Sequence, residues 1–461
     1  MERTSYKRMK LGRSFYRSFF MIYIALVLQN VVTLSVNLAD NMMLGAYSEV
    51  SLSGVAAVNQ IQFVYQQLLF ALGDGLVIFC SQYWGKKMTG PMKRIAATAM
   101  QAGLLICALL FFLVSMFPVQ ALRLFTTDEA IIAEGVRYLG IIRFTYLFFA
   151  ITQILLATLR SVEIVKIAFL LSVQTFFINC GINYVLIYGK FGAPELGVAG
   201  AAIGTLVARI VECIVLICYV RKKEKNLRIR LKDYLKFDKV LCVDYIKITA
   251  PMLLVQGLWG LNTAMQTVIL GHMTAAAIAA NSVASTLFLL VKSIPVGAAS
   301  TASILIGKKI GEGDLDVVKN YARVLQKMFV VIGIISGILL FFLRIPVLRL
   351  YDLSENTREM ANTFLIILSI VAVGMSYQMP TNNGIIRGGG NAMFVVKMDI
   401  ISIWGIVIPL SLIMAFVVKA SPVVVVCCLN ADQIFKCVPA FLEANYGKWI
   451  RKLTRDEDVL D

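Results

Sequence analysis

A few acidic and amide side chains interrupt the long apolar stretches of this sequence, and their types suit proton or cation binding. Asp40 ends the first apolar stretch, and Asn37 lies about one helical turn before it. Asn179 and Asn183 are four residues apart, so in a helix their side chains share one face. A carboxylate partly removed from water can exchange protons near neutral pH, and carboxylate and amide oxygens suit hard cations. The alternatives are a helix-capping Asp40 and asparagines that only hydrogen-bond neighbouring helices.

A second set of charged side chains lies in the C-terminal half, at Lys292, Asp432 and Lys436. Asp432 precedes Lys436 by four residues, which is a favourable spacing for an ion pair along a helix. Lys292 and Asp432 are a further candidate pair, because neither charge is stable alone in lipid. Such a pair either breaks or is protonated during a functional cycle, or it locks two helices statically. The sequence leaves both readings open.

The surroundings of these side chains indicate a membrane. The chain is 59% hydrophobic and 15% charged, whereas a soluble domain is about 45–50% apolar and about 25% charged. A spanning helix needs about 20 mostly apolar residues. Twelve stretches qualify, over residues 18–40, 54–80, 96–117, 136–159, 164–188, 196–220, 247–271, 277–306, 324–343, 361–386, 395–417 and 421–446. The sequence predicts an all-α polytopic membrane protein, because no stretch alternates in polarity as barrel strands do.

The basic residues predict how these helices are oriented. Lysines and arginines gather after the even-numbered stretches, most densely in the linker 221–246. The positive-inside rule therefore places the linker and both termini in the cytoplasm. The net charge of +17 has the same origin, so it does not call for a nucleic-acid partner.

The two halves of the chain resemble each other in order. Asp40–Gly45 aligns with Gln266–Gly271, and Gly85–Lys87 aligns with Gly307–Lys309, each pair separated by about half the chain. Matches that recur in order at one spacing indicate an internal duplication.

The duplication predicts two bundles of six helices each. We expect an N-terminal bundle at 1–220, a basic cytoplasmic linker at 221–246 and a C-terminal bundle at 247–461. Because six is an even number, both bundles would insert in the same direction, related by pseudo-twofold symmetry along the membrane normal. A non-transporting scaffold with the same duplication is the alternative.

Four motifs are spread over nearly the whole chain, at Asn37–Gly45, Asn179–Gly189, Gly197–Thr205 and Gly307–Gly313. Together they resemble the multidrug and toxic compound extrusion (MATE) family. The resemblance implies an efflux transporter that couples the exit of organic, often cationic, compounds to the entry of protons or sodium. It also implies one ion-coupling site. That site would contain Asp40, Asn179, Asn183 and Thr205, with sodium a candidate ligand of the first three.

The sequence departs from the family pattern at several charged positions. Some relatives carry an acid in place of Asn183, and many carry one early in the seventh stretch, where this chain has Gln256. The tenth stretch has no Asp or Glu in its interior. We therefore expect Asp40 to be the coupling carboxylate. The candidates for a substrate cavity are Asn37, Gln256, Trp259, Gln266, Lys292 and Asp432.

These observations predict a non-enzymatic transporter, an antiporter that exports small organic compounds by alternating access. The alternative is a flippase of a related fold for lipid-linked intermediates, which would need an arginine-rich cavity for phosphates. An ATP-driven pump is disfavoured, because the chain has no G-x-x-x-x-G-K-[ST] segment. We expect a multi-pass monomer in the inner or plasma membrane. Its partners would be lipid and small-molecule substrates, without nucleic acid and without any cofactor beyond the coupling proton or sodium.

Overall fold

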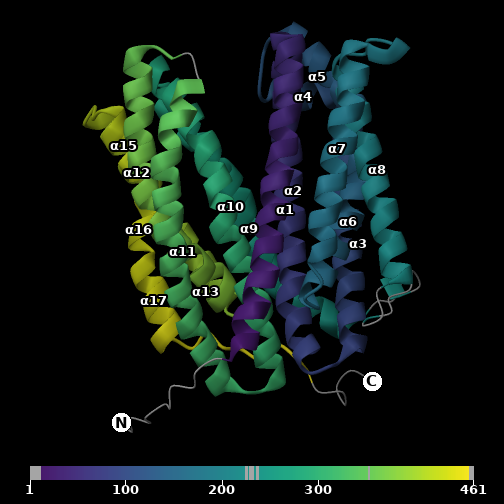
Figure 1. The fold of residues 1–461 in the computed structure, drawn as a ribbon, viewed down its shortest axis with the longest axis vertical. Coiled ribbons are helices and arrows are strands. Elements are labelled where there is room, and N and C mark those ends of the chain that lie inside the picture. The colour runs from purple at the N-terminus through teal and green to yellow at the C-terminus, as the bar shows by residue number, and fades with distance from the viewer. Residues whose placement is uncertain (1–11, 224–226, 228–232, 235–237, 351–352, 456–461) are drawn as a thin grey trace. The chain divides into compact units, whose positions relative to one another are not determined.

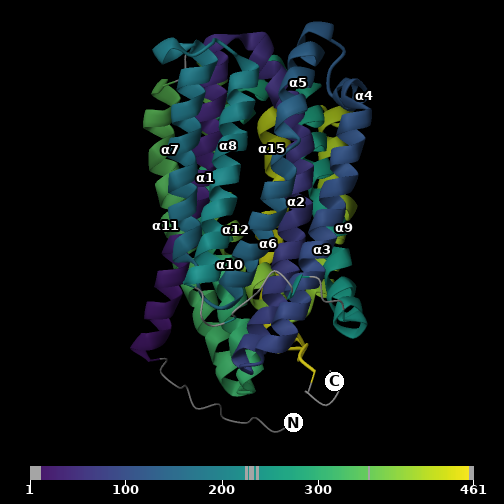
Figure 2. The ribbon, with the colours of Figure 1, turned by 90° about the vertical axis from the view of Figure 1, so that its right-hand side faces the viewer.

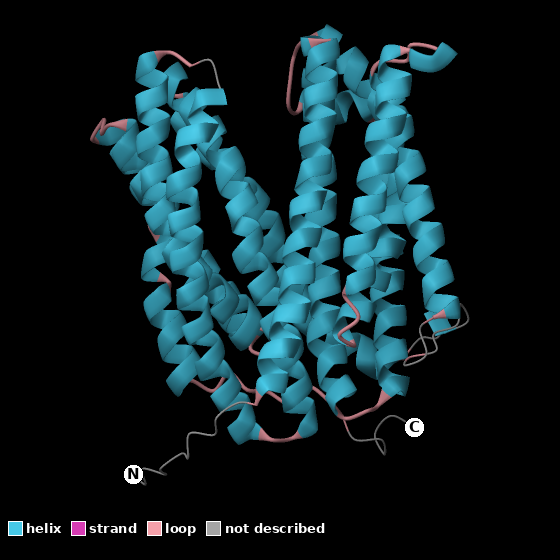
Figure 3. Cartoon of the chain, in the orientation of Figure 1, coloured by secondary structure: helices cyan, strands magenta, loops and turns pink. Residues whose placement is uncertain are grey.

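The computed structural model describes residues 12–223, 227, 233–234, 238–350 and 353–455. Helices and connecting loops make up these residues, and no strand occurs among them (Figure 3). Within the described chain, 11 helices are long and apolar enough to cross a membrane, or 12 when one bent pair counts as a single span. The predicted all-α membrane fold is therefore confirmed.

The helices form two compact units, which we describe separately. The described residues of the Asp40 unit fall within Leu28–Cys80 and Met88–Gly257, and those of the Lys436 unit within Met1–Val27, Ser81–Lys87 and Leu258–Asp456. The predicted bundle boundaries and the axis between the bundles stay predictions, and the linker 221–246 lies partly outside the described residues.

The Asp40 unit is built from long helices and one short one (Figure 1). They are α1 (Arg13–Tyr47), α2 (Glu49–Gly85), α3 (Thr89–Met116), α4 (Pro118–Arg123), α5 (Glu129–Ile142), α6 (Thr145–Ser161), α7 (Lys166–Tyr188), α8 (Val198–Lys222) and the first part of α9 (Lys239–Gly271). The ends of α1 and α2 that lie outside the unit's ranges belong to the other unit. Helices α7 and α8 run side by side over most of their length (Figure 2).

The fourth predicted span is the bent one. It consists of α5 and α6, which meet at an angle of 53°. At the bend, the Thr145 hydroxyl donates a hydrogen bond of 2.6 Å to the carbonyl oxygen of Ile142. A hydroxyl that bonds a carbonyl of the preceding turn competes with the helix ladder and often bends the helix. The break therefore has a local cause that apolarity alone does not reveal.

An aspartate on the linker side fixes the start of α9. Asp238 accepts hydrogen bonds of 3.0 Å from the backbone N–H groups of Val240 and Leu241, and one of 2.9 Å from Arg94. This is the geometry of a helix N-cap. Burial alone would raise the pKa of Asp238, but the Leu241 and Arg94 hydrogen bonds outweigh burial and hold that pKa below its usual range.

The Lys436 unit contains the second part of α9 and the helices that follow it, whereas the short 3-10 helix η1 (Lys190–Gly192) belongs to the Asp40 unit. Several helices of the Lys436 unit change their hydrogen-bond pattern along one span. The helices that follow α9 are α10 (Ala275–Glu312), α11 (Leu315–Leu350), α12 (Glu355–Met379), η3 (Pro380–Ile386), α13 (Ala392–Asp399), η4 (Ile400–Val407), α14 (Ile408–Leu412), η5 (Ile413–Val417), α15 (Pro422–Leu429), α16 (Asp432–Phe435) and α17 (Cys437–Tyr446). The segments η3, η4 and η5 are π-helical. Single π-turns inside helices often occur at functional sites.

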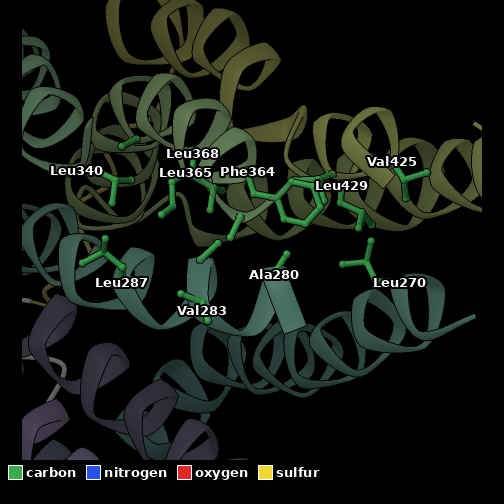
Figure 4. Packing of buried hydrophobic residues seen from close by; sticks show 14 of the residues in the cluster. Leu270, Ala280, Val283, Leu287, Leu340, Phe364, Leu365, Leu368, Val425 and Leu429 are labelled. Atoms are coloured by element: carbon green, nitrogen blue, oxygen red, sulfur yellow. The ribbon is translucent and has the colours of Figure 1, made fainter. Parts of the chain in front are cut away.

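An apolar cluster holds the Lys436 unit together. Phe364, Leu365 and Leu368 of α12 face Val283 and Leu287 of α10, and all five are buried (Figure 4). In a bilayer, close packing and hydrogen bonds rather than water exclusion hold helices together, so such a cluster provides shape complementarity.

Candidate functional site

Asp40 lies near the end of α1, where a second helix supplies its hydrogen-bond donor. The side-chain amide of Asn183 on α7 donates to Asp40 Oδ1 at 2.7 Å. Asn183 is fully buried, whereas Asp40 is half-buried and lines a cavity. A buried donor therefore holds one carboxylate oxygen from behind, while the carboxyl group still borders the cavity.

The hydrogen bonds continue from Asp40 through the other three predicted site residues. Asn183 Nδ2 also lies 3.4 Å from Asn179 Oδ1, and Asn179 Nδ2 donates to the Thr205 hydroxyl at 3.1 Å. The Thr205 hydroxyl donates in turn to the backbone carbonyl of Ala201 at 3.1 Å. The structure thus joins Asp40, Asn183, Asn179 and Thr205 in one chain across α1, α7 and α8. We call this chain the Asp40 relay.

Small residues on α8 allow the relay to form. A methyl group at Gly200 would lie 2.7 Å from the backbone oxygen of Leu186, and one at Gly204 would overlap Asn183 Oδ1. Asn183 Oδ1 is buried and has no hydrogen-bond partner in the described chain. The absent side chain at Gly204 therefore leaves the space in which the Asn183 amide turns its nitrogen toward Asp40. The sequence contained this signal, because Gly204 lies within the Gly197–Thr205 motif.

The cavity in front of the relay has a mixed lining. Its polar groups include Asn37, Asp40, Asn179, Thr205 and Arg209, and the aromatic rings of Tyr138, Tyr146 and Phe149 also line it. Asn37, predicted as a cavity residue, is thus placed there. Aromatic faces beside a carboxylate suit organic cations, since a cation is attracted both to the charge and to the ring.

Arg209 is the basic residue in this lining that the predicted site did not include. Its guanidinium bonds Glu212 at 2.7 Å and lies 5.2 Å from the centroid of the Phe149 ring. Glu212 is buried, so the two charges neutralise each other along α8. Asp40 has no such ion pair within the described residues, although Arg209 interacts with it electrostatically. The spacing of Arg209 and Glu212 in the sixth stretch was the available signal.

Two further cavity candidates lie away from this lining. Gln256 accepts a weak hydrogen bond from Gln67 at 3.4 Å inside the Asp40 unit. Gln266 is half-buried farther along α9, in the Lys436 unit. The structure does not bring either of them into the cavity beside Asp40, and their role in substrate binding stays a prediction.

The remaining candidates belong to the Lys436 unit, where the pairing differs from the predicted one. The Lys292 ammonium lies 4.3 Å from the centroid of the Trp259 ring. Asp432 is paired with Lys436 at 3.0 Å, as their spacing predicted. Lys292 interacts electrostatically with Asp432 but makes no direct ion pair with it in the described chain, and the predicted role of the two residues in a transport cycle stays a prediction. Lys436 is four residues away on the same span and reaches Asp432 directly. It also bonds Asp399 at 2.8 Å, a residue that sequence reasoning missed at the edge of the eleventh stretch.

The chemistry available at the Asp40 relay is the binding of one positive charge. In the described part of the chain, no three His, Cys, Asp or Glu side chains gather as a metal site would require. The Asp40 relay instead consists of one carboxylate, two amides and a hydroxyl. A proton can bind to the carboxylate, and a monovalent cation can bind to several neutral oxygens. The donor set is too weakly charged for a structural zinc or calcium site.

The chain is similar in sequence to known membrane proteins. The MatE family model matches residues 25–185 and 251–413, one segment in each half of the chain. A probable multidrug resistance protein YoeA of Bacillus subtilis (strain 168) is 27% identical over 88% of each chain. A probable multidrug resistance protein NorM of Thermotoga maritima is 25% identical over 93% of this chain and 92% of its own.

Solved structures show the same fold at lower identity. The eukaryotic MATE transporter AtDTX14 superimposes with a TM-score of 0.83 at 18% identity, covering 94% of this chain and 96% of its own. A mutant of the Vibrio cholerae MATE transporter VcmN gives a TM-score of 0.85 at 16% identity, covering 95% and 98%. The two matched segments agree with the internal duplication expected from the sequence.

Proposed function

This chain belongs to the MatE family of multidrug efflux transporters, and on that premise we propose that it is an antiporter that exports small organic, often cationic, compounds in exchange for protons or sodium. The observation that carries the proposal is Asp40, a carboxylate without an ion pair in the described chain that borders a cavity and is held from behind by Asn183. One negative charge at this place can be matched either by the coupling ion or by a cationic substrate.

Exchange follows if these two ligands compete. A proton or sodium at Asp40 neutralises the carboxylate and lowers the affinity of the cavity for an organic cation. A bound organic cation in turn lowers the affinity of Asp40 for a proton or sodium. A ligand shifts the balance between inward-open and outward-open states only by its difference in affinity for the two. Each positive charge that enters the cell gains about 2.3 kcal/mol per 100 mV of membrane potential.

The test is efflux of a fluorescent organic cation from energised membrane vesicles. The driving gradient is switched between protons and sodium, for wild type and for Asp40→Asn. We expect gradient-driven efflux by wild type and its loss in Asp40→Asn, with the effective gradient identifying the ion. Asp128→Asn is the matched control, because Asp128 only caps α5 on an exposed loop and asparagine caps equally well.

The outcomes separate the alternatives. If Asp40→Asn transports as fast as wild type under the effective gradient, Asp40 is not the coupling carboxylate. If wild type transports no organic cation under either gradient, the antiporter proposal fails and lipid-linked substrates become the ones to assay.

Orientation is a second part of the proposal. We expect both termini in the cytoplasm, because the basic residues cluster after even-numbered spans. A pH-sensitive fluorescent protein fused to either end should respond to cytoplasmic pH and not to external pH. A response of either fusion to external pH would contradict this orientation.

A further inference from the structure

Among the described residues of the Lys436 unit, the most buried charged side chain is a lysine held between two carboxylates. Lys436 is 3% exposed, and its ammonium lies 2.8 Å from Asp399 Oδ1 and 3.0 Å from Asp432 Oδ2. Asp399 ends α13 in the eleventh span, whereas Asp432 and Lys436 belong to the twelfth. We call Asp399, Lys436 and Asp432 the carboxylate clamp.

A line of amides leads from the clamp into the tenth span. Gln433 Nε2 donates to Asp432 Oδ2 at 2.8 Å, and Gln378 Nε2 donates to Gln433 Oε1 at 2.8 Å. Asn382 Nδ2 donates to Gln378 Oε1 at 3.0 Å, while Asn382 Oδ1 is buried and has no partner in the described chain. Asn382 lies in the π-helical η3, and Asp399 directly precedes the π-helical η4. The network therefore joins three spans at their irregular turns.

The Lys436 ammonium balances the negative charge of the two carboxylates in the clamp. Two carboxylates from different spans point at one place, and Lys436 places a single positive charge between them. Lys292 of α10 also has an electrostatic interaction with Asp432, but its ammonium lies against Trp259. Without the Lys436 ammonium, two like charges would face each other, the Asp432 side chain 6% exposed and the Asp399 side chain 25% exposed. That arrangement requires a proton or another cation.

The two units treat their carboxylates differently. In the Asp40 unit, Asp40 has an amide partner and no ion pair in the described chain, so its charge is available to an exchangeable ion. In the Lys436 unit, the lysine already satisfies both carboxylates of the clamp. Three donors on a flexible stem let an ammonium occupy a site that would otherwise take a small cation.

We propose that the carboxylate clamp is a cation site of the Lys436 unit that the protein occupies permanently with its own ammonium, so that removing the Lys436 amine opens it to alkali-metal or primary alkylammonium ions. Exchange of the coupling ion is then confined to the Asp40 unit. This consequence rests on the proposed antiport, whereas the cation site itself does not.

The experiment measures thermal unfolding of the purified full-length protein in detergent. All variants carry Asp40→Asn, which removes the other candidate site. Lys436→Ala deletes the propylammonium part of the side chain. Unfolding is followed in sodium, potassium or propylammonium chloride, with choline chloride at equal ionic strength as the reference, because choline is too bulky for a lysine-sized space.

We expect no cation-specific stabilisation when Lys436 is present. In Lys436→Ala, sodium, potassium or propylammonium should raise the unfolding temperature, and the rise should grow with the logarithm of concentration once the site fills. Adding Asp399→Asn should abolish this response, because it removes one of the two carboxylates between which the cation would lie. Lys436→Arg should keep the wild-type indifference to cations.

Three results would overturn the proposal. One is a Lys436→Ala protein whose stability in all three salts equals that in choline chloride. Another is failure to recover Lys436→Ala in any of them, since an accessible site would be rescued by its ligand. The third is a cation response with Lys436 present that Asp399→Asn removes. Because Asp40 is absent throughout, failure here and failure of the efflux test are distinguishable.

Discussion

Gly204→Ala tests the geometry of the Asp40 relay without altering any polar group. The added methyl group would overlap Asn183 Oδ1 and lie 3.1 Å from Asn183 Cγ. The Asn183 amide must then turn away, and α7 and α8 must separate slightly. The Asn183 hydrogen bond to Asp40 and its contact with Asn179 are both lost or lengthened.

The expected cost can be divided between packing and hydrogen bonding. Overpacking a close-packed interior costs about 1–3 kcal/mol. A side-chain hydrogen bond between membrane helices contributes about 0.6 kcal/mol on average, and at most about 1.7 kcal/mol. The steric term therefore dominates the stability change, and we expect a total loss of about 2–4 kcal/mol. The loss of the donor to Asp40 should impair coupling more than it impairs stability.

The assay combines thermal unfolding in detergent with gradient-driven efflux in vesicles. Gly181→Ala is the matched control, since Gly181 is an exposed glycine on α7 with no atom within 4 Å of an added methyl group. The control should be as stable as wild type or slightly more so, because alanine favours helix by about 1 kcal/mol over glycine. A Gly204→Ala protein that unfolds and transports like Gly181→Ala would refute the reasoning.

Two more substitutions probe the relay and the start of α9. Thr205→Val removes the hydroxyl that accepts a hydrogen bond from Asn179 but keeps the shape of the side chain. We therefore expect a stability loss of about 0.6 kcal/mol and slower efflux, with efflux recovered in Thr205→Ser. Normal efflux in the valine variant would contradict a role for the hydroxyl. Asp238→Ala should cost about 1 kcal/mol at neutral pH through the lost N-cap. The pKa of Asp238 is depressed in the folded protein, so the ionised part of its contribution is present above the unfolded pKa of about 3.9 and disappears as pH falls through the folded value. Melting curves from pH 7 to pH 3 should show the gap between Asp238→Ala and wild type narrowing only at the acid end, and a gap that narrows between pH 7 and pH 5 would contradict this.

The sequence alone determined the features that depend on neighbours along the chain. Length and apolarity of each stretch predicted the twelve spans, because a helix that crosses a bilayer satisfies its backbone within itself. The same local logic predicted the Asp432–Lys436 pair four residues apart. The four residues of the Asp40 relay came from motif resemblance, and the structure places them together although they lie on three helices.

Only the tertiary structure decided which distant residues meet. Asp399 lies within the predicted eleventh stretch without any sequence signal for a partner, yet it lies against Lys436 from another span. Lys292 interacts electrostatically with the predicted Asp432, but its direct contact is with the ring of Trp259. Gly204 matters through the space that it leaves for Asn183. The physical reason is common to all three. Hydropathy and helix spacing act within one segment, whereas the partner of a buried charge depends on how neighbouring helices rotate and approach, which small residues and local irregularities control.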